Sequence, residues 1–314
     1  MLVYVIFIVS LAVLVYGADV IINQSEKIAL KFGISEYIIG ATLIALGTSL
    51  PEMAASISAS LNGKPELSIS NIVGSNILNI TLVLGVVLII AKGVDPRRDF
   101  FEKDSSWALF PVLIFIAAIL SGEISRLTGI FFMILMAAYI LFLLKYDKDT
   151  LELANIDSDI KANNFNWLKT ITLLIIGFLM VVYGADYTVD SASKIAKSFG
   201  ISDWIVGVIL VALGTSMPEL VVSVTAAIKG KADMAIGNII GSNMANITIA
   251  LGAAAVANPI KLDFSKYTYD IATMLIATLM LVFITANKMY SKPAGISLLV
   301  LLAIFMEHTI KSIV

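Results

Sequence analysis

The chain has 314 residues, of which 59% are hydrophobic and 14% are charged; its mean hydropathy is +0.96 and its net charge is −2. A soluble domain has about 45–50% apolar and about 25% charged residues, so this composition excludes a soluble enzyme, a secreted disulfide scaffold and a nucleic-acid-binding protein. The lack of cysteine excludes thiol chemistry and sulfur-ligated zinc, and the single histidine, His308, excludes a histidine-based metal site.

Ten apolar runs follow one another along the chain. They cover residues 2–22, 36–61, 67–91, 106–121, 124–145, 167–190, 203–228, 234–257, 267–286 and 293–313. About 20 apolar residues span a bilayer as a helix, which satisfies its own backbone hydrogen bonds. The first run has no basic leader, so we interpret it as a span and not as a cleaved signal. The expected fold is an all-α integral membrane protein with ten transmembrane helices.

A long internal repeat is the strongest feature of the sequence. Residues 15–85 reappear without a gap as residues 182–252, and 37 of the 71 positions are identical. The most similar stretches are GATLIALGTSLPE at 40–52 with GVILVALGTSMPE at 207–219, and SNIVGSNILNIT at 70–81 with GNIIGSNMANIT at 237–248. Soluble solenoid repeats are shorter and more numerous, whereas a two-fold repeat of membrane spans is typical of transporters.

Five spans in each half give the two halves opposite orientations, because an odd number of spans inverts the second copy. With the N-terminus outside, 14 of the 21 Lys and Arg residues fall in cytoplasmic loops, in line with the positive-inside rule. We therefore expect a first repeat at 1–145 with its motif at 40–85, a cytoplasmic linker at 146–166, a second repeat at 167–314 with its motif at 207–252, and both termini outside the cell.

Two acidic residues lie deep within the apolar runs. Glu52 and Glu219 occupy equivalent positions in the second and seventh runs, and no Lys or Arg lies in the same stretches to pair with them. A carboxylate at the bilayer centre costs about 3 kcal/mol on insertion scales. A duplicated acid at this depth indicates a functional site, although a buried acid that is only protonated or paired is the alternative.

Each glutamate ends a motif that should break a helix. The motifs at 47–52 and 214–219 contain a proline, which lacks an N–H and clashes with the carbonyl group four residues earlier, and a glycine, which allows non-helical angles. The break frees carbonyl groups beside the carboxylates, including those of Ala45 and Ala212. Irregular backbone at this depth is tolerated where it lines a cavity or is buried in protein.

The next helix of each repeat carries polar side chains on one face. The set consists of Asn71, Ser75 and Asn79 with their counterparts Asn238, Ser242 and Asn246. We predict that the serines and the last asparagine of each trio line a cavity. Asn71, Asn76 and their counterparts could instead serve only to hydrogen-bond one helix to another. Gly74 and Gly241 would then let the helix backbones approach closely.

The resulting ligands are carboxylate, hydroxyl, amide and carbonyl oxygens, which suit hard cations such as Ca²⁺ and Na⁺. Two carboxylates are balanced by one Ca²⁺ or two Na⁺. Without a cation, the free-energy cost of two buried and mutually repelling carboxylates would exceed roughly 5.5 kcal/mol. A free-energy difference of that size shifts a conformational population by about 10⁴. The ion-free protein would therefore rarely change between outward and inward states, which predicts obligatory exchange by a transporter and not an enzyme.

The doubled G-T-S-x-P-E and G-S-N-x-x-N motifs resemble the alpha repeats of the cation/calcium exchanger superfamily, most closely the prokaryotic members of the sodium/calcium exchanger family. The resemblance covers both repeats and implies ten helices in two inverted five-helix halves. It implies four cation sites between the second, third, seventh and eighth helices, with the first and sixth helices sliding against them. It also implies Na⁺/Ca²⁺ antiport across the cell membrane without a cofactor, and we expect the chain to act as a monomer in the bilayer.

The resemblance implies a metal-ligand set taken position by position. Glu52 and Glu219 would bind Ca²⁺ centrally with the carbonyl groups of Thr48 and Thr215, whose hydroxyls would also serve the sodium sites. The flanking sodium sites would use Ala45, Ser49 and Ser75 on one side and Ala212, Ser216 and Ser242 on the other, while Asn79 and Asn246 would line the middle. Potassium-dependent relatives typically have an acid at the position of Asn246, so the amide argues against K⁺ co-transport and leaves the stoichiometry open.

Several alternatives stay open. Protons can occupy the same oxygens, which would give H⁺/Ca²⁺ exchange, and a K⁺-dependent Na⁺/Ca²⁺ exchanger remains a further variant. A cation channel could use the same oxygen-lined site but would conduct without a counter-ion. Asp19 and Asp186, which end the two VYGAD segments, are either interfacial acids or part of an ion access path.

Overall fold

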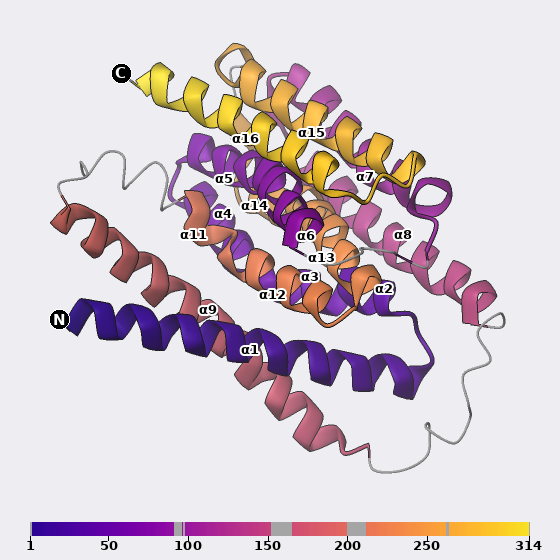
Figure 1. The fold of residues 1–314 in the computed structure, drawn as a ribbon. Helices are drawn as coiled ribbons and strands as arrows, with labels where there is room; N and C mark the ends of the chain where they lie inside the picture. Colours follow the sequence, from indigo (N-terminus) through magenta and orange to yellow (C-terminus); the bar gives the residue numbers. More distant parts are fainter. Residues whose placement is uncertain are drawn as a thin grey trace.

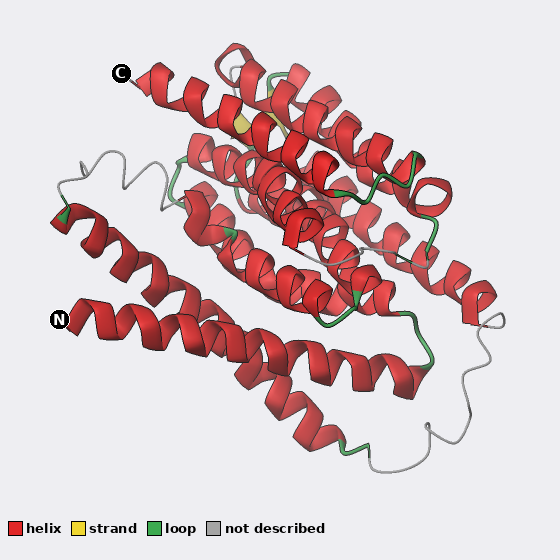
Figure 2. Cartoon of the chain, in the orientation of Figure 1, coloured by secondary structure: helices red, strands yellow, loops and turns green. Residues whose placement is uncertain are grey.

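The computed structural model describes residues 2–90, 96, 98–151, 165–199, 212–261 and 264–313. Figure 2 shows that these residues are almost entirely helical. Helices are expected here because a spanning helix leaves no backbone group unpaired in hydrocarbon. The predicted all-α class is confirmed.

The helices are α1 Leu2–Phe32, α2 Glu36–Ile39, α3 Ala45–Thr48, α4 Leu50–Leu61, α5 Pro65–Leu78, α6 Gly85–Ile90, α7 Phe100–Leu120, α8 Arg126–Leu151, α9 Trp167–Ser198, α11 Ala212–Thr215, α12 Met217–Ile228, α13 Ala232–Ala245, α14 Leu251–Ala257, α15 Thr268–Ala286 and α16 Lys292–Ile313 (Figure 1). Three π-helical turns continue α2, α5 and α13, namely η1 Gly40–Ile44, η2 Asn79–Leu84 and η4 Asn246–Ala250. A short 3-10 turn, η5 Phe264–Tyr267, precedes α15. The strands β1 Glu123–Ile124 and β2 Ile260–Lys261 pair antiparallel, joining the α7–α8 turn to the loop after α14.

Eight helical segments in the described part of the chain are long and apolar enough to cross a membrane, and the bent pair Glu36–Thr48 and Leu50–Leu61 makes up to nine. The predicted span 203–228 lies partly outside the described residues, since it is described only from 212 onward. The predicted linker 146–166 lies outside them from 152 to 164. Many large apolar side chains are exposed on the outer helices, as expected for a surface in contact with lipid. The chain is therefore a multi-pass membrane protein.

The first and sixth spans are longer than the apolar runs 2–22 and 167–190 indicate. Helix α1 has 31 residues and α9 has 32, so at 1.5 Å per residue each is about 47 Å long, against a hydrocarbon core of about 30 Å. The polar sequences that follow these runs contain no proline, so nothing stops the helix at the membrane boundary. The two helices pack against each other on one side of the remaining helices (Figure 1).

Small residues allow α1 and α9 to cross closely. A Cβ atom on Gly17 would lie 2.8 Å from the Met180 Cβ, and a Cβ atom on Gly184 would lie 2.9 Å from the Leu14 Cα. Close backbone approach of this kind is a usual means of helix association in membranes. The crossing therefore depends on glycine at both positions.

The spans formed by α5–α6 and by α13–α14 lie at the centre of the protein. Each is 78% buried, whereas the other single spans are 17–44% buried. A Cβ atom on Gly241 would lie 2.3 Å from the Ala41 carbonyl oxygen, which confirms the predicted close approach there. No described atom lies within 4 Å of the Cβ position of Gly74, and Val208, the repeat counterpart of Ala41, lies outside the described residues.

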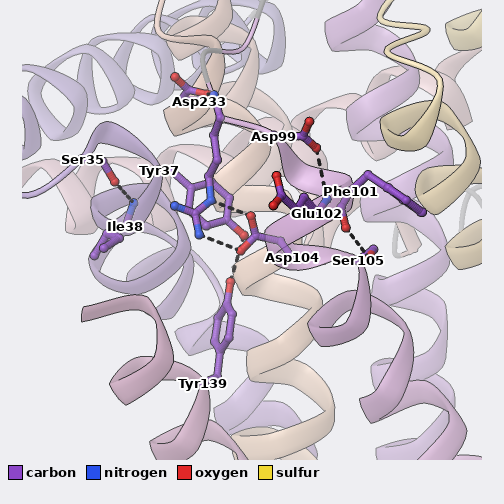
Figure 3. A network of polar contacts seen from close by, with 11 residues as sticks. Ser35, Tyr37, Ile38, Asp99, Phe101, Glu102, Asp104, Ser105, Tyr139 and Asp233 are labelled. Atoms are coloured by element: carbon purple, nitrogen blue, oxygen red, sulfur yellow. Dashed lines mark hydrogen bonds and ion pairs between the residues drawn. The ribbon is translucent and has the colours of Figure 1, made fainter. Parts of the chain in front are cut away.

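A buried polar network that the sequence analysis missed joins α2, α7 and α8. Arg98 Nε donates to Asp104 Oδ2 at 2.5 Å, and the guanidinium lies 4.4 Å from the ring centroid of Tyr37. The hydroxyls of Tyr37 and Tyr139 are 3.0 Å apart, and Figure 3 shows both rings converging on Asp104. Burial opposes the charged form of Arg98, but the hydrogen bond and charge of Asp104 outweigh burial and raise the pKa of Arg98. The network attaches the start of the bent span to α7 and α8.

Candidate cation site

A helix break at Ser49 places Glu52 at the start of a new helix. Ser49 has φ −86° and ψ 5°, and the helices on either side of it are bent by 48°. Pro51 has no N–H, so the Gly47 carbonyl group loses its helical partner. Glu52 lies in the first turn of α4, where the partial positive charge of a helix N-terminus favours a carboxylate. The side chain is only 1% exposed.

The second repeat has the same break. Ser216 has φ −91° and ψ 4°, and Glu219 lies in the first turn of α12 with 1% exposure. Neither carboxylate faces lipid, and the two carboxyl groups interact electrostatically. The Ser49 hydroxyl donates to Glu219 Oε1 at 2.9 Å, so the first motif contacts the acid of the second. The structure thus brings the two predicted acids together.

Buried oxygen atoms without a hydrogen-bond partner are concentrated at the predicted ligands. Leaving a buried polar atom unpaired costs about 1–3 kcal/mol, and such atoms are rare in native proteins. Among the described residues ten buried side-chain atoms lack a partner, and seven of them belong to the predicted set. The seven atoms are Glu52 Oε2, Ser75 Oγ, Asn79 Oδ1, Ser216 Oγ, Glu219 Oε2, Ser242 Oγ and Asn246 Oδ1. All are oxygens drawn from both repeats, and a cation would compensate them.

The backbone departs from α-helical geometry at the two predicted amide ligands. The π-helical turn η2 begins at Asn79, and η4 begins at the equivalent Asn246. Both side chains are 1% exposed. Short π-helical turns occur frequently at functional sites. Nothing in the hydrophobic pattern indicates these turns, so sequence reasoning did not find them.

The threonine and alanine positions are partly engaged in helical bonding. Thr48 is fully buried, and its hydroxyl lies 3.4 Å from both the Ala45 carbonyl oxygen and Asn238 Oδ1. The Ala45 carbonyl also accepts the Ser49 N–H at 3.0 Å. In the second repeat Thr215 lines a cavity, and Ala212 begins α11 directly after the residues 200–211 that lie outside the described chain.

Asn71 and Asn238 bond helices together, as the alternative in the sequence analysis anticipated. Asn71 Nδ2 donates to Ser56 Oγ at 2.8 Å and to the Glu52 carbonyl oxygen at 3.1 Å. Asn238 Nδ2 donates to Ser223 Oγ at 2.9 Å, which is the equivalent contact in the second repeat. These amides hold the broken helices against α5 and α13.

A cavity of about 370 Å³ reaches the second motif from one side. It is lined by α9 together with Pro51, Gly214, Thr215 and Pro218, and α9 contributes Asp186 and Asp190. The repeat counterpart Asp19 is bound differently, because it pairs with Lys229 and accepts a hydrogen bond from Asn23 at 2.8 Å. Asp19 therefore has a structural partner, whereas Asp186 lines the cavity.

The donor set defines the chemistry that the site can support. No group of three or more His, Cys, Asp or Glu side chains suited to a metal ion occurs in the described ranges. The site instead combines two carboxylates with hydroxyl and amide oxygens. Oxygen-only sites with few charges bind hard cations, and Ca²⁺ accepts 6–8 oxygens in flexible geometry.

Comparison with known proteins agrees with this chemistry. The family model described as sodium/calcium exchanger protein matches residues 2–145 and 169–311. The chain is 32% identical to sodium/calcium exchanger MaX1 of Methanosarcina acetivorans over 96% of this chain and 97% of the relative. It is 36% identical to an uncharacterized membrane protein of Methanocaldococcus jannaschii over 94% of each chain. A solved structure of the sodium-calcium exchanger NCX_Mj aligns with a TM-score of 0.81 and 35% identity over 98% of both chains. The chain therefore belongs to the sodium/calcium exchanger protein family.

Proposed function

We propose that this chain exchanges Na⁺ for Ca²⁺ by alternating access at a central site that contains Glu52 and Glu219. The observation that carries the proposal is the set of seven partnerless buried oxygens, which comes from both repeats and includes one carboxylate oxygen from each. Neither acid has a basic partner among the described residues, and a bound cation would offset a charge that is costly at this depth. The remaining predicted ligands, Thr48, Thr215, Ala45 and Ala212, complete the proposed set with Ser49.

We assign ten spans in two inverted halves, 1–145 and 167–314, and the packing of α13 supports this. A Cβ on Gly237 would lie 2.5 Å from the Tyr37 carbonyl oxygen, and one on Gly241 would lie 2.3 Å from that of Ala41. From the first contact to the second, the residue number rises by four on both helices, so α2–η1 and α13 run parallel. The chain reverses at Gly63, where φ is +68°, before α5 begins. Helices α5 and α13, which are repeat counterparts, therefore run in opposite directions.

The two sides of the site differ, which fits one state of an alternating-access cycle. On one side lies the cavity beside α9 with Asp186. On the other side, Lys229 pairs with Asp19 of α1, and Lys231 pairs with Glu26 and Glu36. The positive-inside rule places these lysines in the cytoplasm, so we assign the cavity to the outer face and both termini to the outside.

Calcium uptake into sodium-loaded vesicles tests the function directly. We expect Glu52→Gln and Glu219→Gln each to abolish uptake, because each removes half of the charge that binds Ca²⁺. Glu66→Gln is a matched control, since Glu66 is 65% exposed at the start of α5. Uptake that persists without internal sodium, in potassium-free buffer and with the proton gradient collapsed, would contradict antiport with Na⁺. Such uptake would indicate a channel.

A further inference from the structure

Four amide side chains form a reciprocal set of hydrogen bonds between the two repeats. Asn76 Nδ2 donates to the Asn243 carbonyl oxygen, and Asn243 Nδ2 donates to the Asn76 carbonyl oxygen, both at 3.3 Å. Asn79 Nδ2 donates to Asn243 Oδ1 at 3.0 Å, and Asn246 Nδ2 donates to Asn76 Oδ1 at 3.1 Å. Each side-chain oxygen of the inner pair, Asn76 and Asn243, therefore accepts from the opposite repeat.

We propose that Asn76 and Asn243 are positioning residues that make Asn79 and Asn246 present oxygen, and not nitrogen, to the transported cation. The proposal rests on the proposed function, because it concerns the same site. An amide group is nearly symmetric in shape, so packing alone does not determine which end faces a cavity. An NH₂ group facing a cation would repel it.

The contacts of the inner pair remove this ambiguity. Asn76 and Asn243 are themselves held in one orientation, because each donates its amide hydrogen to the other's backbone carbonyl oxygen. Each consequently offers Oδ1 as an acceptor, and only the NH₂ end of Asn246 or Asn79 can pair with it. The oxygens of Asn79 and Asn246 are left buried and without a partner. The positioning is enforced from the opposite repeat in both cases.

The backbone contributes to the same arrangement. The π-helical turns begin at Asn79 and Asn246, one helical turn after the inner pair. A wider turn changes the direction of the side chain that starts it, relative to a continuous α-helix. The π-helical turn and the hydrogen bond from the opposite repeat therefore both act on the side chains of Asn79 and Asn246. Asn71, by contrast, donates its hydrogen bonds to the neighbouring helix α4 of its own repeat.

A double-mutant cycle separates positioning from general stability. We expect Asn243→Leu to raise the half-saturating Ca²⁺ concentration by about tenfold or more, as measured by calcium binding to the purified full chain. In the background of Asn79→Leu, the same Asn243→Leu change should have no further effect, because its target is already gone. In the background of Asn246→Leu it should retain an effect. For Asn76→Leu the two backgrounds exchange roles. It should have no further effect in the background of Asn246→Leu and should retain an effect in the background of Asn79→Leu.

Ser60→Ala provides the stability control. Ser60 Oγ donates to the Ala254 carbonyl oxygen at 2.7 Å and thereby joins α4 to α14 without touching a proposed ligand. We expect it to lower the thermal stability without changing the half-saturating Ca²⁺ concentration. If Asn243→Leu does not fold, Asn243→Ala, which is smaller, replaces it. An Asn243 variant that folds and binds Ca²⁺ like the parent overturns the positioning role.

The same measurements distinguish this proposal from the proposed function. If Glu52→Gln abolishes binding while the asparagine cycle is additive, the cation site stands and the positioning role is wrong. If Glu52→Gln binds Ca²⁺ like the parent, the central site itself is wrong. A cycle that is non-additive for the pairs Asn243 with Asn79 and Asn76 with Asn246, but additive for the exchanged pairs, supports the proposal.

Discussion

The hydroxyl of Ser49, in the first repeat, donates a hydrogen bond to Glu219 Oε1, in the second repeat, at 2.9 Å. The equivalent hydroxyl of Ser216 has no partner. The two motifs are therefore related in sequence, but their serine hydroxyls are not identically bonded.

We expect Ser49→Ala to weaken sodium binding more than calcium binding. The change removes a hydrogen bond to a charged group, which contributes about 1.5–3 kcal/mol, and it removes a proposed sodium ligand. The corresponding shift in half-saturating Na⁺ concentration is about tenfold or more. Sodium-dependent calcium efflux from vesicles measures it. Ser58→Ala, at an exposed position on α4, is the control. If Ser49→Ala and Ser58→Ala shift the half-saturating Na⁺ concentration equally, the Ser49 hydroxyl has no specific role in sodium binding.

Asp186 and Asp19 should respond differently to loss of charge, although they are repeat counterparts. Asp186 lines the cavity, so Asp186→Asn should raise the half-saturating Ca²⁺ concentration without lowering the maximal rate, because a charge near an access path attracts cations. The effect should shrink as salt is added, since the screening length is about 10 Å at 0.1 M. Initial rates of calcium uptake at several ionic strengths measure it. A salt-independent effect would contradict attraction through solvent.

Asp19→Asn is the matched comparison for that experiment. Asp19 pairs with Lys229, which also donates to Asn23 Oδ1 at 2.8 Å, so Asp19→Asn removes the counter-charge of a lysine at the end of α12 and does not remove a charge from the cavity. We expect its effect on the half-saturating Ca²⁺ concentration to be the smaller of the two. A larger effect of Asp19→Asn than of Asp186→Asn would indicate that the access path runs beside α1.

The two acids of the proposed cation site could be singled out from the sequence because the chemistry is duplicated. Glu52 and Glu219 are costly at membrane depth, and their equal placement in two copies left few explanations other than a shared site. Composition and hydrophobic runs were equally sufficient for the all-α class, since a helix is the simplest element that satisfies its backbone in lipid.

Several features could not be predicted because they depend on contacts between distant segments. Nothing local marks Ser49 as the partner of Glu219, or Asn76 as the acceptor for Asn246. The π-helical turns at Asn79 and Asn246 leave no trace in a hydrophobic pattern. The apolar runs also underestimated α1 and α9, because a helix continues past the bilayer when no residue stops it.

Gly241→Ala should destabilise the protein more than Gly85→Ala. The new Cβ on Gly241 would lie 2.3 Å from the Ala41 carbonyl oxygen, so the backbones of α13 and η1 would have to separate. At Gly85 the nearest atom is the Gly295 carbonyl oxygen at 3.2 Å, which requires only a small shift. Thermal unfolding of the detergent-solubilised variants gives the comparison. Similar unfolding temperatures would show that the contact at Gly241 is easily relaxed.

The attachment of α1 to the α12–α13 loop should control access from that side. Lys231 pairs with Glu26 of α1 and, at 2.7 Å, with Glu36 of α2. Burial lowers the pKa of Lys231, but the hydrogen bonds and charges of Glu26 and Glu36 outweigh burial and raise its pKa above the ordinary 10.5. Because the pKa of Lys231 is raised, the ion pairs stabilise the folded protein fully at any pH below 10.5. This stabilisation is lost only as the pH rises through the raised pKa. The pairs are therefore intact at neutral pH.

We expect Lys231→Ala to release the end of α1 and to increase exposure of the residues beneath it. Ser25 is adjacent to Glu26 and fully buried, and the chain has no cysteine, so Ser25→Cys offers a single reporter thiol. Its labelling at neutral pH should be slow in the otherwise unchanged chain and several-fold faster with Lys231→Ala. Lys194→Ala is the control, because the partner of Lys194 in the described part of the chain is Asp190 of the same helix, at 2.6 Å on an exposed surface. If both lysine variants label at the same rate as the parent, the ion pairs do not hold α1 in place, and closure of this side must come from the apolar contacts of α1 with α12.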